Sequence, residues 1–212
     1  VFVAVGDVNG VDFWNEYGTY GRERAGAPTE IVSGAAYGAF TARNVWESLD
    51  GRPFVDEQRT FTFYNQSAAC RTVDLTVTFT ASYGDVQFGP TKEAGPLGIR
   101  VNESLRADRG GQFRNAYGAE NEDECWGRPA PWCDYAGVID GRRYGIAAFD
   151  HEDNERYPTT WHIRNYGLFA ANNLYFKGGL TIPAGQTLTY RFRLCFYENE
   201  LDTAAKFLQW AK

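Results

Sequence analysis

The chain has 212 residues, of which 43% are hydrophobic and 23% charged, and its formal net charge is −6. This acidic balance argues against a nucleic-acid partner or an anionic membrane surface, because both favour a basic face. No apolar run approaches the roughly 18 residues that span a bilayer, so we expect no membrane partner.

The start of the sequence indicates an incomplete domain. The chain contains no Met and opens directly on the strand-like stretch VFVAVGDV. We therefore expect residues before Val1 to be missing, with any targeting segment among them, which leaves the compartment open. Because the sequence shows no linker and no internal repeat, residues 1–212 are expected to form a single domain that is truncated at its N-terminus.

Strand-like segments follow one another along the chain. Period-two alternation is clearest in TVDLTVTFTA at 72–81 and TLTYRFRLCFY at 187–197, and shorter candidates are FVAVGD, RTFTFYN, LGIRVN, YGIAAFD, TWHIRNYGLFA and GGLTIP. Turn pairs such as Asp50-Gly51, Gly110-Gly111 and Asp140-Gly141 separate them. Many short strands at this spacing predict an all-β fold, a large antiparallel β-sandwich.

The two alternating segments also predict which side chains face the core. One phase of each segment is apolar and is expected inside, namely Val73, Leu75, Val77, Phe79, Leu188, Phe192, Leu194 and Phe196. Cys195 falls on the polar phase of the second segment, which is typical of an ordinary free thiol.

A helical period is convincing only at the C-terminal end. Asp202 can cap the segment TAAKFLQWAK, so we expect one short C-terminal helix that packs on a sheet edge or a sandwich end. Its apolar stripe would consist of Leu201, Ala204, Ala205, Leu208 and Ala211. The acidic run Glu120–Glu124 is expected to be a solvated loop.

The four cysteines do not define a metal site or a disulfide scaffold. None of them forms a C-x-x-C pair, which argues against structural zinc. Cys125 and Cys133 flank the loop WGRPAPW and would form a disulfide only if that loop folds back on itself. The sequence leaves this pairing open.

Both histidines of the chain lie in one segment, FDHEDNERYPTTWHIRNYG, which runs from Phe149 to Gly167. On a strand, His162, Arg164 and Tyr166 would share one face. His151 would reach the same place if the end of its own strand lies alongside. We hypothesise that this segment is one wall of a site, and the alternative is a solvated loop followed by a structural His.

A second candidate group lies in GPTKEAGPLGIRV. Lys92 and Glu93 occupy a turn rich in Gly and Pro, and Arg100 faces away from its apolar neighbours on the following strand. A carboxylate near a cation can act as a general base or hold a sugar hydroxyl. A charged surface hairpin is the alternative. We expect His151, His162, Arg164, Glu93 and Arg100 to converge on one concave surface.

Aromatic residues accompany these charges. CWGRPAPWCDYAG contains Trp126, and GVDFW contains Trp14, and one of the two is expected at the edge of the site. Sugar rings stack on aromatic planes while their hydroxyls bind charged side chains, so this composition is typical of a sugar site. The alternative is that the aromatic residues fill the β core.

Several of these stretches resemble a known family. GDVNGVDFW, FGPTKEAGPLGIRV, WCDYAG and GIAAFDHEDNERYPTTWHIRNYGLFAANN resemble, in this order, motifs of the bacterial "PmoA family", also called methane oxygenase PmoA-like. The resemblance covers nearly the whole chain. It implies a domain of uncharacterised function associated with sugar metabolism, with a β-sandwich like that of the galactose mutarotases, a galactose-mutarotase-like supersandwich.

The resemblance also implies a set of site residues. The matching positions are Asp12, Lys92, Glu93, Arg100, Asp150, His151, Asn154, His162 and Arg164. The sequence departs from the family pattern in having Glu152 where Pro usually follows the Asp-His pair. Members also carry a His-His-x-Gly motif just before the position that matches Val1, and this part of the family's pattern is absent from the sequence.

Taken together, the residues and the resemblance predict a carbohydrate-active domain that performs acid/base chemistry on a glycoside or an oxidised sugar. The catalytic candidates are Glu93, His151 and His162, and the substrate-binding candidates are Lys92, Arg100, Arg164, Asp150, Asn154, Trp14 and Trp126. The expected partner is a small-molecule sugar, and no cofactor is expected. Two alternatives stay open: a non-catalytic sugar-binding module, and a metal enzyme that uses two His and one carboxylate.

Overall fold

The computed structural model describes residues 1–211, without the side chain of Ala94, and its strands form three sheets. The strands are β1 (Phe2–Val5), β2 (Gly21–Ala25), β3 (Thr29–Ser33), β4 (Tyr37–Ser48), β5 (Pro53–Tyr64), β6 (Cys70–Thr80), β7 (Val86–Phe88), β8 (Ala94–Arg100), β9 (Gln112–Asn115), β10 (Trp132–Ile139), β11 (Arg142–Asp150), β12 (Trp161–Ile163), β13 (Leu168–Ala171), β14 (Leu180–Ile182) and β15 (Thr187–Glu198). The helical elements are α1 (Asn121–Cys125), α2 (Thr203–Trp210) and the short 3-10 turns η1 (Glu103–Leu105) and η2 (Ala107–Arg109).

The large sheet has nine strands in the order β2-β4-β5-β6-β15-β11-β10-β9, with β3 beside β4. Its pairs are antiparallel, and the longest unbroken ladder joins β15 to β6 from Thr187↔Thr80 to Tyr197↔Cys70. These two strands are the segments with the clearest period-two alternation. A sheet of this kind follows from that pattern because alternate side chains must be buried on one face.

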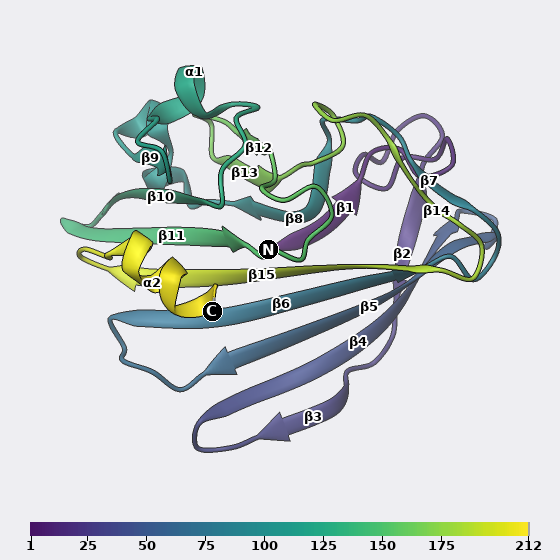
Figure 1. Ribbon diagram of the computed structural model, residues 1–212, viewed down its shortest axis with the longest axis horizontal. Coiled ribbons are helices and arrows are strands. Elements are labelled where there is room, and N and C mark those ends of the chain that lie inside the picture. Colours follow the sequence, from purple (N-terminus) through teal and green to yellow (C-terminus); the bar gives the residue numbers. More distant parts are fainter. Residues whose placement is uncertain (212) are drawn as a thin grey trace.

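The small sheet has four strands in the order β1-β8-β13-β12, and it lies across the large sheet as a second layer (Figure 1). Its inward side chains, such as Leu97, Ile163 and Phe169, join one apolar core with Leu75 and Phe192 of the large sheet. The sequence prediction of a large antiparallel β-sandwich is confirmed by these two packed layers.

The structure confirms which face of β6 and β15 was predicted to be buried, although side chains near the ends of β15 are only half-buried. Leu75, Val77 and Phe79 are fully buried, and Phe192 and Leu194 are nearly so. Leu188 and Phe196 point to the same side but are only half-buried, because they lie near the ends of β15 where less of the second layer covers them.

The C-terminal helix α2 lies on the outer face of the large sheet (Figure 1). As predicted, Asp202 caps it, and its carboxylate accepts the backbone N–H of Ala205 at 3.0 Å. The predicted apolar stripe is confirmed only for Leu201, just before the helix, which packs on the sheet. Ala204 and Leu208 are exposed, and the helix itself contacts the sheet through Phe207 and Trp210. The reason is that these two rings offer more apolar area than the alanines of the expected stripe.

Two further expectations change in the folded chain. Residues Asn121–Cys125 of the acidic run form the short helix α1 rather than a loop. Cys195 is buried although it lies on the polar phase of β15, because α2 covers that face. All four cysteines are free thiols, so Cys125 and Cys133 are not bridged. Within residues 1–211, no helix is long and apolar enough to cross a membrane.

Candidate functional site

Most of the predicted residues gather on the outer face of the small sheet. In β12, Trp161 and Ile163 point into the core, so His162 between them points outward. The strand register places His162, Ala170, Gly98 and Phe2 in one row across the four strands. A side chain at Gly98 would collide with the Phe2 ring, 2.0 Å from a Cβ at that position, so glycine lets the ring lie flat across the sheet.

Two arginines share one aromatic ring at the end of this face. The guanidinium carbon of Arg164 lies 5.3 Å from the centre of the Tyr166 ring, and that of Arg100 lies 5.4 Å from the same centre. Arg164 also lies 6.0 Å from the centre of the Trp126 ring. Arg100 is exposed and has no ion pair with any residue that the structure describes. These contacts bring two cations and two aromatic rings together at one place.

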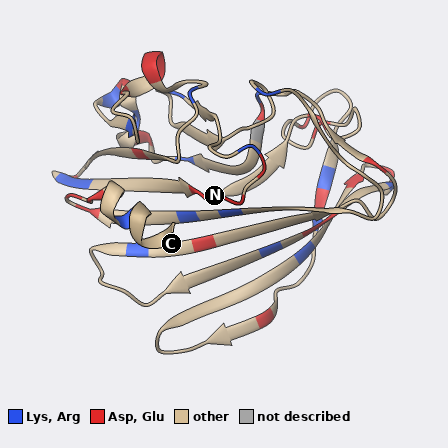
Figure 2. Ribbon diagram, viewed as in Figure 1, with Lys and Arg blue, Asp and Glu red and all other residues tan. Residues whose placement is uncertain are grey.

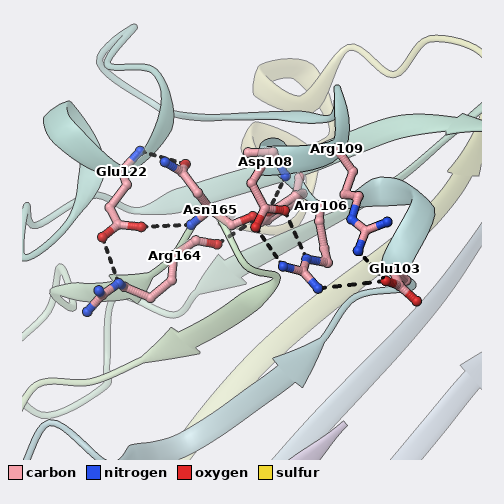
Figure 3. Close-up of polar contacts among 9 residues, drawn as sticks. Glu103, Arg106, Asp108, Arg109, Glu122, Arg164 and Asn165 are labelled. Atoms are coloured by element: carbon pink, nitrogen blue, oxygen red, sulfur yellow. Dashed lines mark hydrogen bonds and ion pairs between the residues drawn. The ribbon is translucent and has the colours of Figure 1, made fainter.

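Helix α1 holds Arg164 in position, as Figure 3 shows. Glu122 of α1 binds the Arg164 guanidinium at 2.7 Å through one carboxylate oxygen and accepts the backbone N–H of Asn165 at 2.8 Å through the other. The Asn165 side chain in turn accepts the backbone N–H of Glu122 at 3.3 Å. Asp108 of η2 reaches the same turn, because its N–H donates to the Asn165 carbonyl. The acidic run therefore serves to orient a cation of this face.

His162 is 2% exposed, and its Nδ1 atom has no hydrogen-bond partner among the described residues. Burial, together with the charges of Arg164 and Lys92, lowers the pKa of His162 to about 4, while a hydrogen bond with the Lys92 backbone acts in the opposite direction. At neutral pH the imidazole is therefore uncharged. Because Nδ1 has no partner, the hydrogen bond with the Lys92 backbone must involve Nε2. Nε2 then carries the proton of the neutral ring, and Nδ1 is a free acceptor.

A free donor lies beside this free acceptor. The Trp126 ring lies edge-on to His162 at 6.2 Å between ring centres, and its Nε1–H is buried without a partner. Phe176 packs edge-on against the other side of the indole at 4.9 Å. Buried polar atoms are nearly always paired, so these two unpaired atoms of neighbouring rings point to a bound water or ligand group that supplies their partners.

The turn with Lys92 and Glu93 folds over the opposite end of this face. Lys92 and Glu93 approach each other at 3.6 Å, and the Glu93 N–H donates to the Thr91 hydroxyl at 3.1 Å. The Thr91 carbonyl accepts from Asn172 at 3.0 Å, which fixes the turn on the sheet. The charges of Lys92 in this turn and of Arg164 both act on His162, so His162 lies between the turn and Arg164.

The two candidate tryptophans lie at different edges of the small sheet. Trp126 is beside β12, whereas Trp14 packs on Phe2 of β1 at 4.8 Å. Asp12 fixes the turn that carries Trp14, because its carboxylate accepts the backbone N–H of Trp14 at 2.7 Å. Only Trp126 therefore contacts the group around His162, and Asp12 holds a turn.

The expected convergence is wrong for His151. Its ring packs edge-on against Trp210 of α2 at 5.1 Å, on the outer face of the large sheet. In β11, Phe149 faces α2 while Ala148 faces the core, so the next outward position after Phe149 belongs to the α2 side. Both sheets therefore lie between His151 and His162, and the two histidines cannot share one monosaccharide.

Asp150 and Asn154, both predicted to bind substrate, hold the loop after β11. Asp150 accepts the Asn154 side-chain amide at 2.7 Å and the Thr159 backbone N–H at 2.7 Å. Asn154 also exchanges two hydrogen bonds of 2.7 Å with the backbone of Arg191 in β15. Burial raises the pKa of Asp150 to about 6, and these hydrogen bonds lower it in part. The pair ties the loop to the large sheet, away from the outer face of the small sheet.

Sequence reasoning missed two residues of this group, because nothing in the sequence linked Glu122 or Phe176 to this place. Strand phase had placed Tyr166 with His162 and Arg164, although Tyr166 was not named as a binding candidate. A separate cavity of about 310 Å³ lies at one end of the sandwich, lined by Leu105, Ile139, Ile146, Phe196 and Arg71 among others, none of which was a site candidate.

No metal centre is evident in the described part of the chain, where no three His, Cys, Asp or Glu side chains lie together as ligands. The two-His-one-carboxylate alternative needs both histidines at one metal ion, and the opposite placement of His151 and His162 contradicts it.

The fold and this face define an antiparallel β-sandwich domain with a cluster of charged and aromatic residues on the outer face of its smaller sheet. The chain belongs to a family of unknown function, DUF6807, whose model matches residues 1–210. No curated protein matches it. Among solved structures, it is similar to one described as a heparinase III gene product with methylated lysines, at 10% identity and a TM-score of 0.31, over 88% of this chain and 22% of that one. The chain thus spans less than a quarter of that protein's length.

Proposed function

We propose that this chain is a carbohydrate-active domain that binds a glycoside or an oxidised sugar on the outer face of the small sheet. The observation that carries the proposal is the pair of unpartnered buried atoms, His162 Nδ1 and Trp126 Nε1, beside the guanidinium of Arg164. A sugar hydroxyl both donates and accepts, so bound hydroxyls would supply the partner that each of these atoms lacks. The motif resemblance to the PmoA-like family agrees with a domain of unknown function, and its link to sugar metabolism is part of this proposal.

The two arginines favour a substrate that carries or develops negative charge. Arg100 has no carboxylate partner in the described chain, and Arg164 is held by Glu122 with its guanidinium over Tyr166. Such cations would bind the carboxylate of a uronate or stabilise an oxyanion during elimination or epimerisation. The neutral His162 is the proposed base, and Glu93 at the neighbouring turn is the proposed second acid/base group.

The test uses the full chain with D-glucuronate and methyl β-D-glucoside as calorimetric probes and with p-nitrophenyl glycosides and glucuronides as substrates. Because His162 and Arg164 contact the proposed site, His162→Gln and Arg164→Met should each weaken binding about tenfold or more, at roughly 1.4 kcal/mol per tenfold. His151→Gln is the matched control, since it removes the other imidazole from the opposite face. Thermal melting of each variant checks that it is folded.

The same experiment separates the two candidate functions. Binding with turnover that His162→Gln abolishes supports acid/base catalysis at this face. Binding without turnover on any probe supports a sugar-binding module. Equal effects of His151→Gln and His162→Gln, or no binding of any probe, would contradict the proposed site.

A further inference from the structure

A second group of charged and aromatic residues lies on the inner face of the large sheet, far along β4 and β5 from the core. The inward row of this strand pair begins with Trp46 and Val55, which are fully buried, and ends with Phe63, which is 45% exposed. Figure 1 shows that the small sheet does not extend over β3 and the adjoining parts of β4 and β5. The inner face of the large sheet is therefore open at this end.

Two charged side chains, Glu57 and Arg59, occupy the middle of that row, and Glu23 of the neighbouring strand β2 joins them. Glu57 is 1% exposed and accepts hydrogen bonds from the Trp46 indole at 2.8 Å and from Arg59. Arg59 uses the same Nη2 atom to bind Glu57 at 2.7 Å and Glu23 of β2 at 3.0 Å. Glu23, Arg59 and Glu57 thus form one connected triad in which only Glu57 is completely buried.

The surroundings make this triad costly as a purely structural device. The cross-strand neighbours of Glu57 and Arg59 in β6 are Phe79 and Val77, both fully buried core residues. Charged groups in such a place lose hydration, and apolar residues of similar size are often at least as stable. Burial raises the pKa of Glu23 to about 7, with Glu57 adding to the rise and Arg59 opposing it.

Two atoms of the triad keep hydrogen-bonding capacity. Arg59 donates through Nε and Nη2, which leaves Nη1 without a partner among the described residues. Glu23 accepts through Oε2 only, so its Oε1 atom also has no partner among the described residues. The Glu23 side chain is 26% exposed. Charges of both signs alternate along β2 (Figure 2). Arg22 and Arg24 form ion pairs with Glu47 on the opposite face of the sheet, so they do not compete for Glu23.

An aromatic strip continues from the triad toward the exposed end. Phe40, Phe61 and Phe63 form it, with ring centres 5.4 Å apart for Phe40–Phe61 and 6.1 Å apart for both other pairs. Phe63 lies nearly parallel to both other rings, at 23° and 24°. The strip is an apolar surface that begins next to Arg59 on β5, and Glu23 lies further along, at the level of Trp46.

We propose that this open inner face, formed by Phe40, Phe61, Phe63, Arg59 and Glu23, is a second binding site, for the rings of a neutral oligosaccharide. The C–H face of a sugar ring would stack on Phe61 and Phe63. One hydroxyl would donate to Glu23 Oε1 and another would accept from Arg59 Nη1. Glu57, held by Trp46, keeps Arg59 in position and contacts no ligand itself.

This site is independent of the one proposed around His162. The triad and the strip lie on the inner face of the large sheet, whereas His162 lies on the outer face of the small sheet. A ligand for the strip needs no anionic group, whereas the Arg100–Arg164 pair favours one. Failure of one proposal would therefore leave the other unaffected.

The test measures binding of cellopentaose, xylopentaose and maltopentaose to the full chain by calorimetry. Phe63→Ala should weaken binding of at least one pentasaccharide about tenfold or more, because it removes an exposed stacking ring without opening the core. Glu23→Gln keeps the shape of the side chain and should weaken binding several-fold. Thr62→Ala, on the opposite face of the same strand, should leave the affinity unchanged.

Three outcomes would overturn the proposal. The first is that none of the three pentasaccharides binds. The second is that a pentasaccharide binds with an affinity that Phe63→Ala and Glu23→Gln leave unaltered. The third is that sedimentation shows a dimer which Phe63→Ala converts to a monomer, because a second copy of the chain would then cover the strip.

Discussion

At the scale of single residues, burial decides what each titratable group can do. His162 and His151 are the same residue type in one short segment, yet one is buried beside cations and the other lies partly exposed on Trp210. Burial favours the uncharged form of His162, which makes its free Nδ1 an acceptor for a substrate hydroxyl. The same physical effect gives Asp150 a raised pKa, although its role is to hold a loop.

A stability measurement tests the neutral state of His162. Its pKa is lowered to about 4 in the folded chain, so the unfolded chain binds a proton first as the pH falls from 6.5 toward 4. Its contribution to stability is present above pH 6.5 and should fall by about 2 kcal/mol by pH 4.5. Urea unfolding at pH 7 and pH 4.5 should show that His162→Gln removes this part of the pH dependence.

The matched control for this measurement is His151→Gln, which changes the other imidazole of the same segment. We expect that variant to retain the loss of stability on acidification that His162 produces. If wild type and His162→Gln lose the same free energy between the two pH values, His162 is not held neutral by burial, and its proposed role as an acceptor is wrong.

At the scale of elements, two short segments that look solvated in the sequence have structural tasks. The acidic run forms α1 and orients Arg164 through Glu122. The loop after β11 is fixed to β15 by Asn154, which bonds the Arg191 backbone and the buried Asp150. In both cases a polar side chain satisfies backbone groups that would otherwise be buried without partners.

The loop after β11 offers a direct test. Asn154→Ala removes one of the two hydrogen bonds of the buried Asp150 and both bonds between Asn154 and the Arg191 backbone, so we expect a loss of about 2–3 kcal/mol in the free energy of unfolding. Asp153→Ala is the control in the same loop, because that side chain is 67% exposed and should change stability by about 0.5 kcal/mol or less. Chemical denaturation measures both, and equal small losses would mean that Asn154 does not fix the loop.

At the scale of the whole molecule, the two layers differ in extent, and this difference creates the open inner face. The large sheet has nine strands and the small sheet four, so part of the large sheet has no second layer. The uncovered end includes β3, whose five residues are all exposed and which pairs only with β4. Edge strands of this kind are open to other chains and to solvent.

Amide hydrogen exchange should therefore be fast in one region of the large sheet and slow in another. Amides of β3 should exchange orders of magnitude faster than those of β6 and β15, which lie in the middle of the sheet over the buried core. Mass spectrometry of peptides from the exchanged protein measures this difference at neutral pH. Protection of β3 as strong as that of β6 would show instead that another chain covers this edge in solution.

The agreement between sequence and structure differs between the two sites. Ring contacts and charges link His162 with Arg164, Lys92 and Trp126, and strand phase alone had placed His162 with Arg164. Arg100 joins them only through the Tyr166 ring that it shares with Arg164, and Glu93 contacts Lys92. Strand phase could not place His151, because it fixes the two sides of one strand and says nothing about which layer that strand belongs to. The triad of Glu23, Arg59 and Glu57 gave no sequence signal, since its members come from two strands.

By itself, the sequence determined the all-β class, the inward phase of β6 and β15, and the cap of α2 at Asp202. These are local properties, because alternation and capping involve neighbours within a few residues. Only the tertiary structure decided which faces are covered. α2 buries Cys195 on the polar phase of β15, two full layers separate His151 from His162, and the small sheet leaves Phe63 uncovered. The physical reason is that burial depends on which elements meet across the fold, and pairs such as β1 with β8 are formed by residues far apart in the chain.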